Sequence, residues 1–385
     1  MNSKMIFHML VLLFCVVSVS VFNVGCGKSD GHANSGTLNS YNFVYFGNLG
    51  SSTINSYFLK SDGSVTSVTN TISTGAGTSN ISSLIGSPDG KFLYATNKSS
   101  NNISWYSIDP LTAATEGSIA YSGLADSNGS GSSATKIHPN GNLCFIANST
   151  SVTNNISICT INKDTGEMTV DEDTFFTART NPTNLVISPD GRFLFVVNRG
   201  TSDISSFSIN SVTGSLNAID LSVSAGTNPE DLVIHPGGRF LYTLSPGSNS
   251  VIMHSISTSG ALAPLSPVSV ATGAGAKKIV ITPNGKYVFV SNNTDNTISG
   301  YSVNSTNGQL TAIAGSPIAG VVGAGVYALA VTLESQFLVV TGDTNGKGYV
   351  YAIDDGTGAL TMVGSEIALG ANPRAVSIVP LSAVE

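Results

Sequence analysis

Short apolar runs alternate with turn signals along most of this chain, and residues 181–219 show the pattern most clearly. Apolar runs cover Leu185 to Ser188, Arg192 to Val197 and Ile204 to Ile209, and a weaker fourth run follows Thr213-Gly214. Runs of this length between turn residues predict β-strands. The second run is apolar at both sets of alternating positions, so both faces of its strand should be covered by protein.

The turn that precedes the second run recurs about every 50 residues, and a fixed period is the signature of a repeat architecture. Its proline presets φ at the second turn position, and glycine is favoured at the fourth. A degenerate copy, Thr332 to Ser335, follows the clear ones. The clear copies are Ser87-Pro88-Asp89-Gly90, His138-Pro139-Asn140-Gly141, Ser188-Pro189-Asp190-Gly191, His235-Pro236-Gly237-Gly238 and Thr282-Pro283-Asn284-Gly285.

The two ends of the repeat region complement each other. Residues Asn372 to Pro380 match only the first strand of another copy. The strands that this copy lacks are found near the N-terminus, at Phe43 to Phe46, at Ile54 to Leu59 and from Val65 onward. Six complete copies and one split copy therefore make seven.

A second periodicity supports the same alignment. Each copy has a second-strand residue whose predicted partner across the hairpin lies in the third strand, and such pairs stabilise sheets. An aliphatic residue faces an aromatic one in most copies. The pairs are Leu93 with Tyr106, Leu194 with Phe207, Leu241 with His254, Val288 with Tyr301, Leu338 with Tyr351, Val44 with Tyr57, and Cys144 with Cys159.

These patterns predict an all-β, seven-bladed β-propeller of four-stranded blades. In that fold each blade packs between two neighbours in a ring. The blade split between the N- and C-termini closes the ring with main-chain hydrogen bonds and leaves no exposed edge. A β-sandwich is the alternative, but it does not predict seven equivalent copies.

Composition adds limits to this picture. Residues 41–385 form one predicted domain, because the repeats leave no interior stretch unassigned. The formal net charge of −7 provides no basic field for nucleic acid, and only 10% of residues are charged. We expect a monomer with no nucleic-acid partner.

The N-terminus has a different character. Lys4 precedes an apolar run from Met5 to Phe22, which ends at Gly25-Cys26. This arrangement resembles the lipobox of bacterial lipoproteins, although Asn23 replaces the usual branched apolar residue. We therefore expect a signal peptide at residues 1–25, a lipid on Cys26, a flexible tether at residues 26–40, and a cell-envelope location, as an outer-membrane lipoprotein facing the periplasm or the cell surface. An ordinary secretory signal and an uncleaved anchor helix are the alternatives.

Two cysteines remain in the predicted propeller. Cys144 and Cys159 take directly opposed positions in one hairpin, a spacing that permits a disulfide. An oxidising compartment favours the bond, and two buried thiols are the alternative.

The loops that lead into the innermost strands are the candidate functional segments. Each carries Asn or Gly at one position, which indicates a positive φ there. The residue two positions later varies between copies, unlike a purely structural position. Those variable residues are Arg374, Ser82, Ser133, Thr183, Glu230, Lys277 and Tyr327. We take Arg374, Lys277, Glu230, Thr183 and Tyr327, with Arg199, as candidate ligand-binding residues at one mouth of the central channel.

The copies resemble the seven-bladed lactonase family, which includes propeller-type phosphogluconolactonases, and the related YVTN repeat proteins. The resemblance covers about residues 41–380 and rests on motifs such as Ser188 to Asn198 and Asp164-Thr165-Gly166. It implies the blade structure well and the activity poorly.

The family's catalytic motif is incomplete in this chain. Active members carry Gly-Pro-Arg-His before an innermost strand and Asn-Glu after the next strand. The equivalent segment here is Asn228-Pro229-Glu230-Asp231, and in another copy Arg374 is followed by Ala375 instead of histidine. No copy has glutamate after its second strand; the residues there are Leu49, Lys98, Ser149, Arg199, Pro246, Asn293 and Asp343.

The remaining chemistry-bearing residues favour structural interpretations. His138 and His235 lie in turns at the opposite face, and His254 takes an aromatic core position. Asp171-Glu172-Asp173 has no spacing typical of calcium ligands, so a solvated acidic loop is expected. We expect no metal and no cofactor.

The sequence therefore predicts an envelope lipoprotein whose propeller binds a protein partner or a small polar ligand, without catalysis. It would contact the membrane only through its lipid. One alternative is a lactonase that uses Glu230 and Arg374, and another is a purely structural envelope protein.

Overall fold

The computed structural model describes residues 42–68, 71–74, 80–109, 117–151, 155–172, 176–319 and 324–380. The predicted signal peptide, lipidated Cys26 and tether lie outside the described residues, as does Asp173 of the acidic loop. In the described part of the chain, no helix is long and apolar enough to span a membrane.

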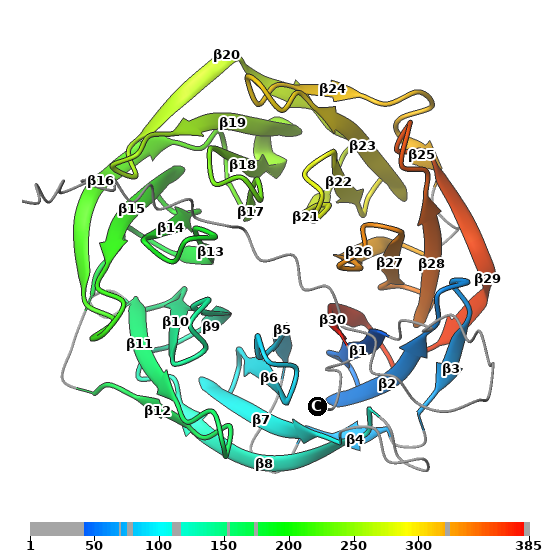
Figure 1. Ribbon diagram of the computed structural model, residues 1–385, viewed down its shortest axis with the longest axis horizontal. Coiled ribbons are helices and arrows are strands. Elements are labelled where there is room, and N and C mark those ends of the chain that lie inside the picture. The colour runs from blue at the N-terminus through cyan, green and yellow to red at the C-terminus, as the bar shows by residue number, and fades with distance from the viewer. Residues whose placement is uncertain are drawn as a thin grey trace, which may run out of the picture. The chain divides into compact units, whose positions relative to one another are not determined.

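Seven antiparallel sheets are arranged in a ring, as the repeat pattern predicts (Figure 1). The first three complete blades follow in chain order. Blade 1 has β5 (Ile81–Gly86), β6 (Phe92–Asn97), β7 (Asn102–Ile108) and β8 (Ile119–Asp126). Blade 2 has β9 (Ser132–Ile137), β10 (Leu143–Asn148), β11 (Ile156–Ile161) and β12 (Met168–Val170). Blade 3 has β13 (Pro182–Ile187), β14 (Phe193–Asn198), β15 (Asp203–Ile209) and β16 (Leu216–Ser224).

The next three blades repeat this order. Blade 4 has β17 (Asp231–Ile234), β18 (Phe240–Ser245), the 3-10 turn η1 (Pro246–Ser248), β19 (Ser250–Ile256) and β20 (Leu262–Ala271). Blade 5 has β21 (Ala276–Ile281), β22 (Tyr287–Asn292), β23 (Thr297–Val303), β24 (Leu310–Ala312) and β25 (Ile318–Ala319). Blade 6 has β26 (Val326–Val331), β27 (Phe337–Gly342), β28 (Lys347–Ile353) and β29 (Leu360–Ala368).

Blade 7 joins the two ends of the ring, which confirms the predicted closure. It has β30 (Pro373–Pro380), β1 (Asn42–Asn48), β2 (Thr53–Leu59), β3 (Val65–Ser67) and β4 (Ile72–Ser73). Phe43 pairs with Val379, and Gly47 pairs with Ala375. Blades 5 and 7 differ from the predicted four strands only because their outermost strand is in two pieces, both paired with the same neighbour.

The second strand of every blade is buried along its whole length, as its two apolar faces predict. All seven predicted cross-hairpin pairs are present in the register of the sheets. Cys144 and Cys159 are directly opposed and joined by a disulfide, with a Cα–Cα distance of 4.9 Å.

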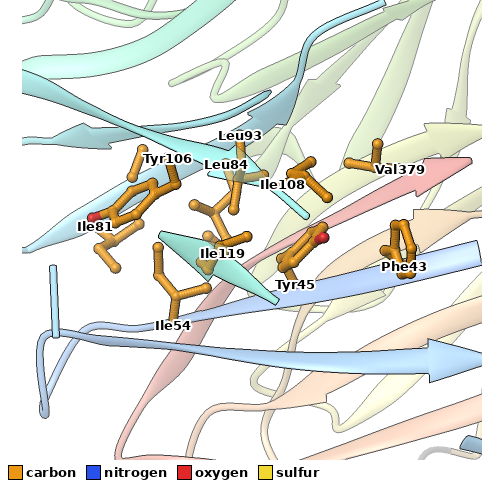
Figure 2. Close-up of a cluster of buried hydrophobic side chains, with 12 residues drawn as sticks. Phe43, Tyr45, Ile54, Ile81, Leu84, Leu93, Tyr106, Ile108, Ile119 and Val379 are labelled. Atoms are coloured by element: carbon orange, nitrogen blue, oxygen red, sulfur yellow. The ribbon is translucent and has the colours of Figure 1, made fainter. Parts of the chain in front are cut away.

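The hydrophobic core lies between neighbouring blades. In the cluster between blades 7 and 1, Phe43 and Val379 pack with Leu93 and Tyr106 (Figure 2). The turn between the outer strands of one blade also contacts the preceding blade: a Cβ added to Gly117 would lie 2.3 Å from the ring of Phe43. Gly117 has a φ of 71°, so glycine is required there for both conformation and space.

Candidate functional site in the central channel

A cavity of about 440 Å³ occupies the channel, and the innermost strands of all seven blades contribute to its lining. Four charged side chains line it: Lys136, Asp231, Lys278 and Arg374. Three basic side chains and one carboxylate therefore face the cavity of a chain whose formal net charge is −7.

The loops that lead into the innermost strands have the predicted backbone. A positive φ is present at all seven positions, which are Asn372, Asn80, Gly131, Asn181, Asn228, Gly275 and Gly325. In six of the seven blades, the register between the first and second strands shifts immediately afterwards. Such a β-bulge leaves one residue outside the hydrogen-bond ladder and re-aims its side chain. The residues so placed are the variable ones that the sequence singled out.

Arg374 lines the cavity and is held from one side by blade 6. Its Nε and Nη2 atoms donate to the two carboxylate oxygens of Asp343, at 2.8 and 2.9 Å. Its guanidinium also lies 5.0 Å from the centroid of the Tyr327 ring. Burial raises the pKa of Tyr327, although the nearby Lys278 and Arg374 oppose this effect. Arg374 is therefore oriented before any ligand arrives.

The other predicted site residues are less closely assembled. The ammonium of Lys277 is 3.9 Å from a carboxylate oxygen of Glu230, in the neighbouring blade. Thr183 is half-buried, and its hydroxyl has no hydrogen-bond partner in the described part of the chain. Of the predicted binding residues, only Arg374 is among the residues that line the cavity, and Arg199 is exposed. The structure thus places Arg374 beside Tyr327 and Glu230 beside Lys277, and it leaves Arg199 apart.

Sequence reasoning missed a polar network one position deeper, across blades 3, 4 and 5. The Asn184 amide donates to Oδ1 of Asp231, which also accepts from the backbone N–H of Leu232 at 3.0 Å. The other oxygen, Oδ2, accepts from the N–H of Ile279 at 3.2 Å and lies 3.9 Å from Nζ of Lys278. One carboxylate therefore ties three consecutive innermost strands together.

The two channel lysines differ in their electrostatic surroundings. Burial lowers the pKa of Lys278, but Asp231, Tyr327 and Glu230 outweigh burial and raise it above its ordinary value. Burial also lowers the pKa of Lys136, Lys278 lowers it further, and Asp231 compensates only in part. Lys136 is part-exposed because its side chain lines the cavity. The pKa of Lys278 is thus raised and that of Lys136 is lowered, so the two channel lysines differ in basicity.

A signal for this network was present in the sequence. Asn184, Asp231 and Lys278 occupy the same position in three consecutive copies, directly after the variable residue. Polar residues at an innermost-strand position in adjacent blades indicate side chains within reach of one another. Asp231 stands where the resemblance places the lactonase histidine.

The histidines tie the fold together. His138 is buried, its Nδ1 accepts from the N–H of Asn140 at 3.1 Å, and its Nε2 lies 2.9 Å from the carbonyl of Gly191 in the next blade. With Nδ1 as the acceptor, Nε2 is the nitrogen placed to donate to the Gly191 carbonyl. His235 makes the equivalent turn contact with the N–H of Gly237. Among the described residues, no cluster of three or more His, Cys, Asp or Glu side chains is placed to hold a metal ion.

His254 yields a pH prediction. It is buried opposite Leu241, and burial lowers its pKa to about 4 from 6.5. The unfolded chain binds a proton at this histidine at a higher pH than the folded protein does. The contribution of neutral His254 to the free energy of unfolding is therefore fully present above about pH 6.5. It falls by on the order of 3 kcal/mol as the pH drops toward 4. The variant His254→Tyr, which carries the residue found in four other copies, should remove this part of the slope in urea unfolding measured across that range. An unchanged slope would show that His254 is protonated in the folded protein.

Comparison with known proteins identifies the family and the fold of the chain. The sequence model of the lactonase family of 7-bladed β-propellers matches residues 40–273 and 220–378. No curated protein sequence matches the chain. The structure of the periplasmic gluconolactonase of Pseudomonas aeruginosa is similar with a TM-score of 0.73 at 20% identity, covering 89% of this chain and 100% of that one.

Two further solved structures share the architecture. A Bacteroides fragilis protein provisionally assigned as a 6-phosphogluconolactonase has a TM-score of 0.73 at 22% identity, covering 90% of this chain and 100% of that one. Hydrazine synthase of Kuenenia stuttgartiensis has a TM-score of 0.58 at 16% identity, covering 79% and 92%. At these identities the likeness establishes the fold alone.

Proposed function

The chain belongs to the lactonase family of seven-bladed β-propellers, and from that premise we propose that its channel binds a small anionic ligand of the sugar-acid class without hydrolysing a lactone. The observation that carries the proposal is the cavity lining, in which Arg374 and Lys278 are cationic and Lys136 adds a third nitrogen donor, against one carboxylate. Arg374 and Lys278 supply charge-assisted donors for a carboxylate or phosphate. Ser82, Ser83 and Asn184 add polar groups suited to hydroxyls. The sugar-acid class follows from the names of the similar proteins, 6-phosphogluconolactonase and gluconolactonase.

Hydrolysis has weaker support, because it needs a base for the attacking water as well as a cation or donor for the oxyanion. Cations are available in the channel. The carboxylate of Asp231 already accepts three hydrogen bonds and lies beside Lys278. Glu230 lies 3.9 Å from the ammonium of Lys277 and is not among the residues that line the cavity. The residual case for a lactonase rests on family membership.

Binding and turnover can be separated in one experiment. Calorimetry with gluconate and 6-phosphogluconate should give saturable binding that weakens by about tenfold in Lys278→Met, since one charge-assisted contact contributes on the order of 1.4 kcal/mol. Lys60→Met is the matched control, because it removes the same charge from an exposed turn. Glucono-δ-lactone and 6-phosphogluconolactone should hydrolyse no faster than they do spontaneously. Absence of binding would refute the binding proposal, and turnover abolished by Glu230→Gln would promote the lactonase.

We place this module at the bacterial cell envelope, anchored by a lipid on Cys26. The support is the apolar run that ends at Gly25-Cys26 and the Gly/Ser/Asn-rich tether that follows it. The intact mass of the native protein tests this placement: acyl chains on an N-terminal Cys26 are expected. An unmodified N-terminus beyond residue 26 would contradict the anchor.

A further inference from the structure

Lys136 is the one charged cavity-lining side chain to which the described part of the structure gives neither an ion pair nor a hydrogen bond. It projects from β9, and the other cavity cations have partners: Lys278 has Asp231, and Arg374 has Asp343. The Lys136 side chain lines the cavity of about 440 Å³, which is large enough for a small organic molecule.

We propose that Lys136 is a nucleophilic amine that forms an imine with a small aldehyde or ketone entering the channel. This inference goes beyond the proposed function and does not rest on it. A lysine becomes a nucleophile when it is desolvated and lies close to another cationic group. Burial is the main cause that lowers the pKa of Lys136; Asp231 acts in the opposite direction without cancelling burial, and Lys278 lowers the pKa further. The neutral amine is the reactive form.

The neighbouring groups suit the steps of this reaction. The Lys136 nitrogen attacks the carbonyl carbon, an N–C bond forms, and the carbonyl π electrons move to oxygen. Lys278, held protonated beside Asp231, provides a positive charge and a proton for that oxygen. The attached nitrogen gives up one proton to the Lys278 amine, which passes it to the hydroxyl, so that water leaves as the C–O bond breaks and the nitrogen lone pair forms the C=N bond. The remaining N–H proton of the resulting iminium then restores the Lys278 ammonium. The net reaction joins an amine and a carbonyl to give an imine and water, with no oxidant or reductant.

The structure makes Lys136 different from the other lysines in a measurable way. Lys60 and Lys163 are exposed, and Lys91 lies 3.9 Å from Asp89 at the surface. Those amines are open to water and are not enclosed in the channel cavity. Reaction with a carbonyl at pH 7 should therefore select Lys136.

Reductive trapping tests the proposal. The purified protein is incubated with propanal and cyanoborohydride at pH 7, and labelled sites are found by peptide mass spectrometry. Propanal is uncharged, so its reaction does not depend on anion binding. Labelling of Lys136 is expected at least tenfold faster than labelling of any exposed lysine. In Lys278→Met the like charge is lost, so the pH profile of labelling at Lys136 should shift to higher pH.

Two controls separate imine formation at Lys136 from a general loss of charge and from anion binding. Lys60→Met should leave the labelling rate of Lys136 unchanged. A parallel reaction with glyoxylate asks whether an added carboxylate increases the rate, which is expected if the channel also binds anions. If glyoxylate and propanal label Lys136 equally fast, the binding proposal is weakened while the imine proposal holds. If Lys136 in the wild-type protein reacts no faster than the exposed lysines, the inference is wrong, whatever any variant does.

Discussion

Deleting residues 373–385 should abolish cooperative folding of the whole ring. The deletion removes β30, whose Ala375 and Val379 belong to the core between blades 7 and 1. Val376 and Ile378 pack on the other side, against the core shared with blade 6. Fully burying a Val or Ile side chain contributes roughly 1.5–3 kcal/mol, so the loss is about 5 kcal/mol or more. Domains are stable by only about 5–15 kcal/mol, and β1 would also be left as an unpaired edge.

Two controls separate the loss of the strand from the shortening of the chain. Deleting only residues 381–385, which lie outside the described part, should leave the melting temperature unchanged. Moving residues 372–380 in front of Asn42 should restore folding, because Pro380 already pairs with Asn42 and a turn of about four residues can join them. A truncated protein that melts like the parent would show that blade 7 does not close the ring.

The fold was predictable because the sequence pattern of one blade recurs several times along the chain. Turn signals, doubly apolar second strands and facing pairs each recur with one period, so an error in one copy is corrected by the others. The copy with Cys144 and Cys159 shows this well: its residues differ from the other pairs, yet the register is the same. The broken outer strands of blades 5 and 7 escaped prediction because outer strands are short and weakly apolar.

The site was predicted only in part, because its contacts join different blades. In the sequence, Arg374 stood out among the residues of the loops before the innermost strands. Asp343 appeared among the residues that follow the second strands, and nothing linked the two. In the structure they form a two-pronged ion pair across blades 6 and 7. Lys136 lay at a position where the other copies are mostly apolar, so no pattern marked it. Its importance follows only from the cavity that it faces.

The last expected result concerns Asp231, whose carboxylate joins blades 3, 4 and 5. The variant Asp231→Leu keeps much of the side-chain volume but removes both oxygens. It leaves the Asn184 amide and the Ile279 N–H without their acceptor, and it leaves Lys278 without its countercharge. Breaking a buried pair in this way costs about 3–5 kcal/mol. Urea unfolding should show this loss as a lower midpoint with an unchanged slope.

The variant Lys278→Met should cost much less, since Asp231 would still accept hydrogen bonds from Asn184, Leu232 and Ile279. In the double variant no ammonium is left uncompensated, so Asp231→Leu should be cheaper by about 1–3 kcal/mol when Lys278 is already Met. Lys60→Met again provides the matched loss of charge and should not couple to Asp231. Additive losses in the double variant would mean that the carboxylate holds the blades together through its backbone and amide donors alone. The ion pair between Lys278 and Asp231 would then contribute nothing to the free energy of unfolding, and a ligand could pair with Lys278 without lowering stability.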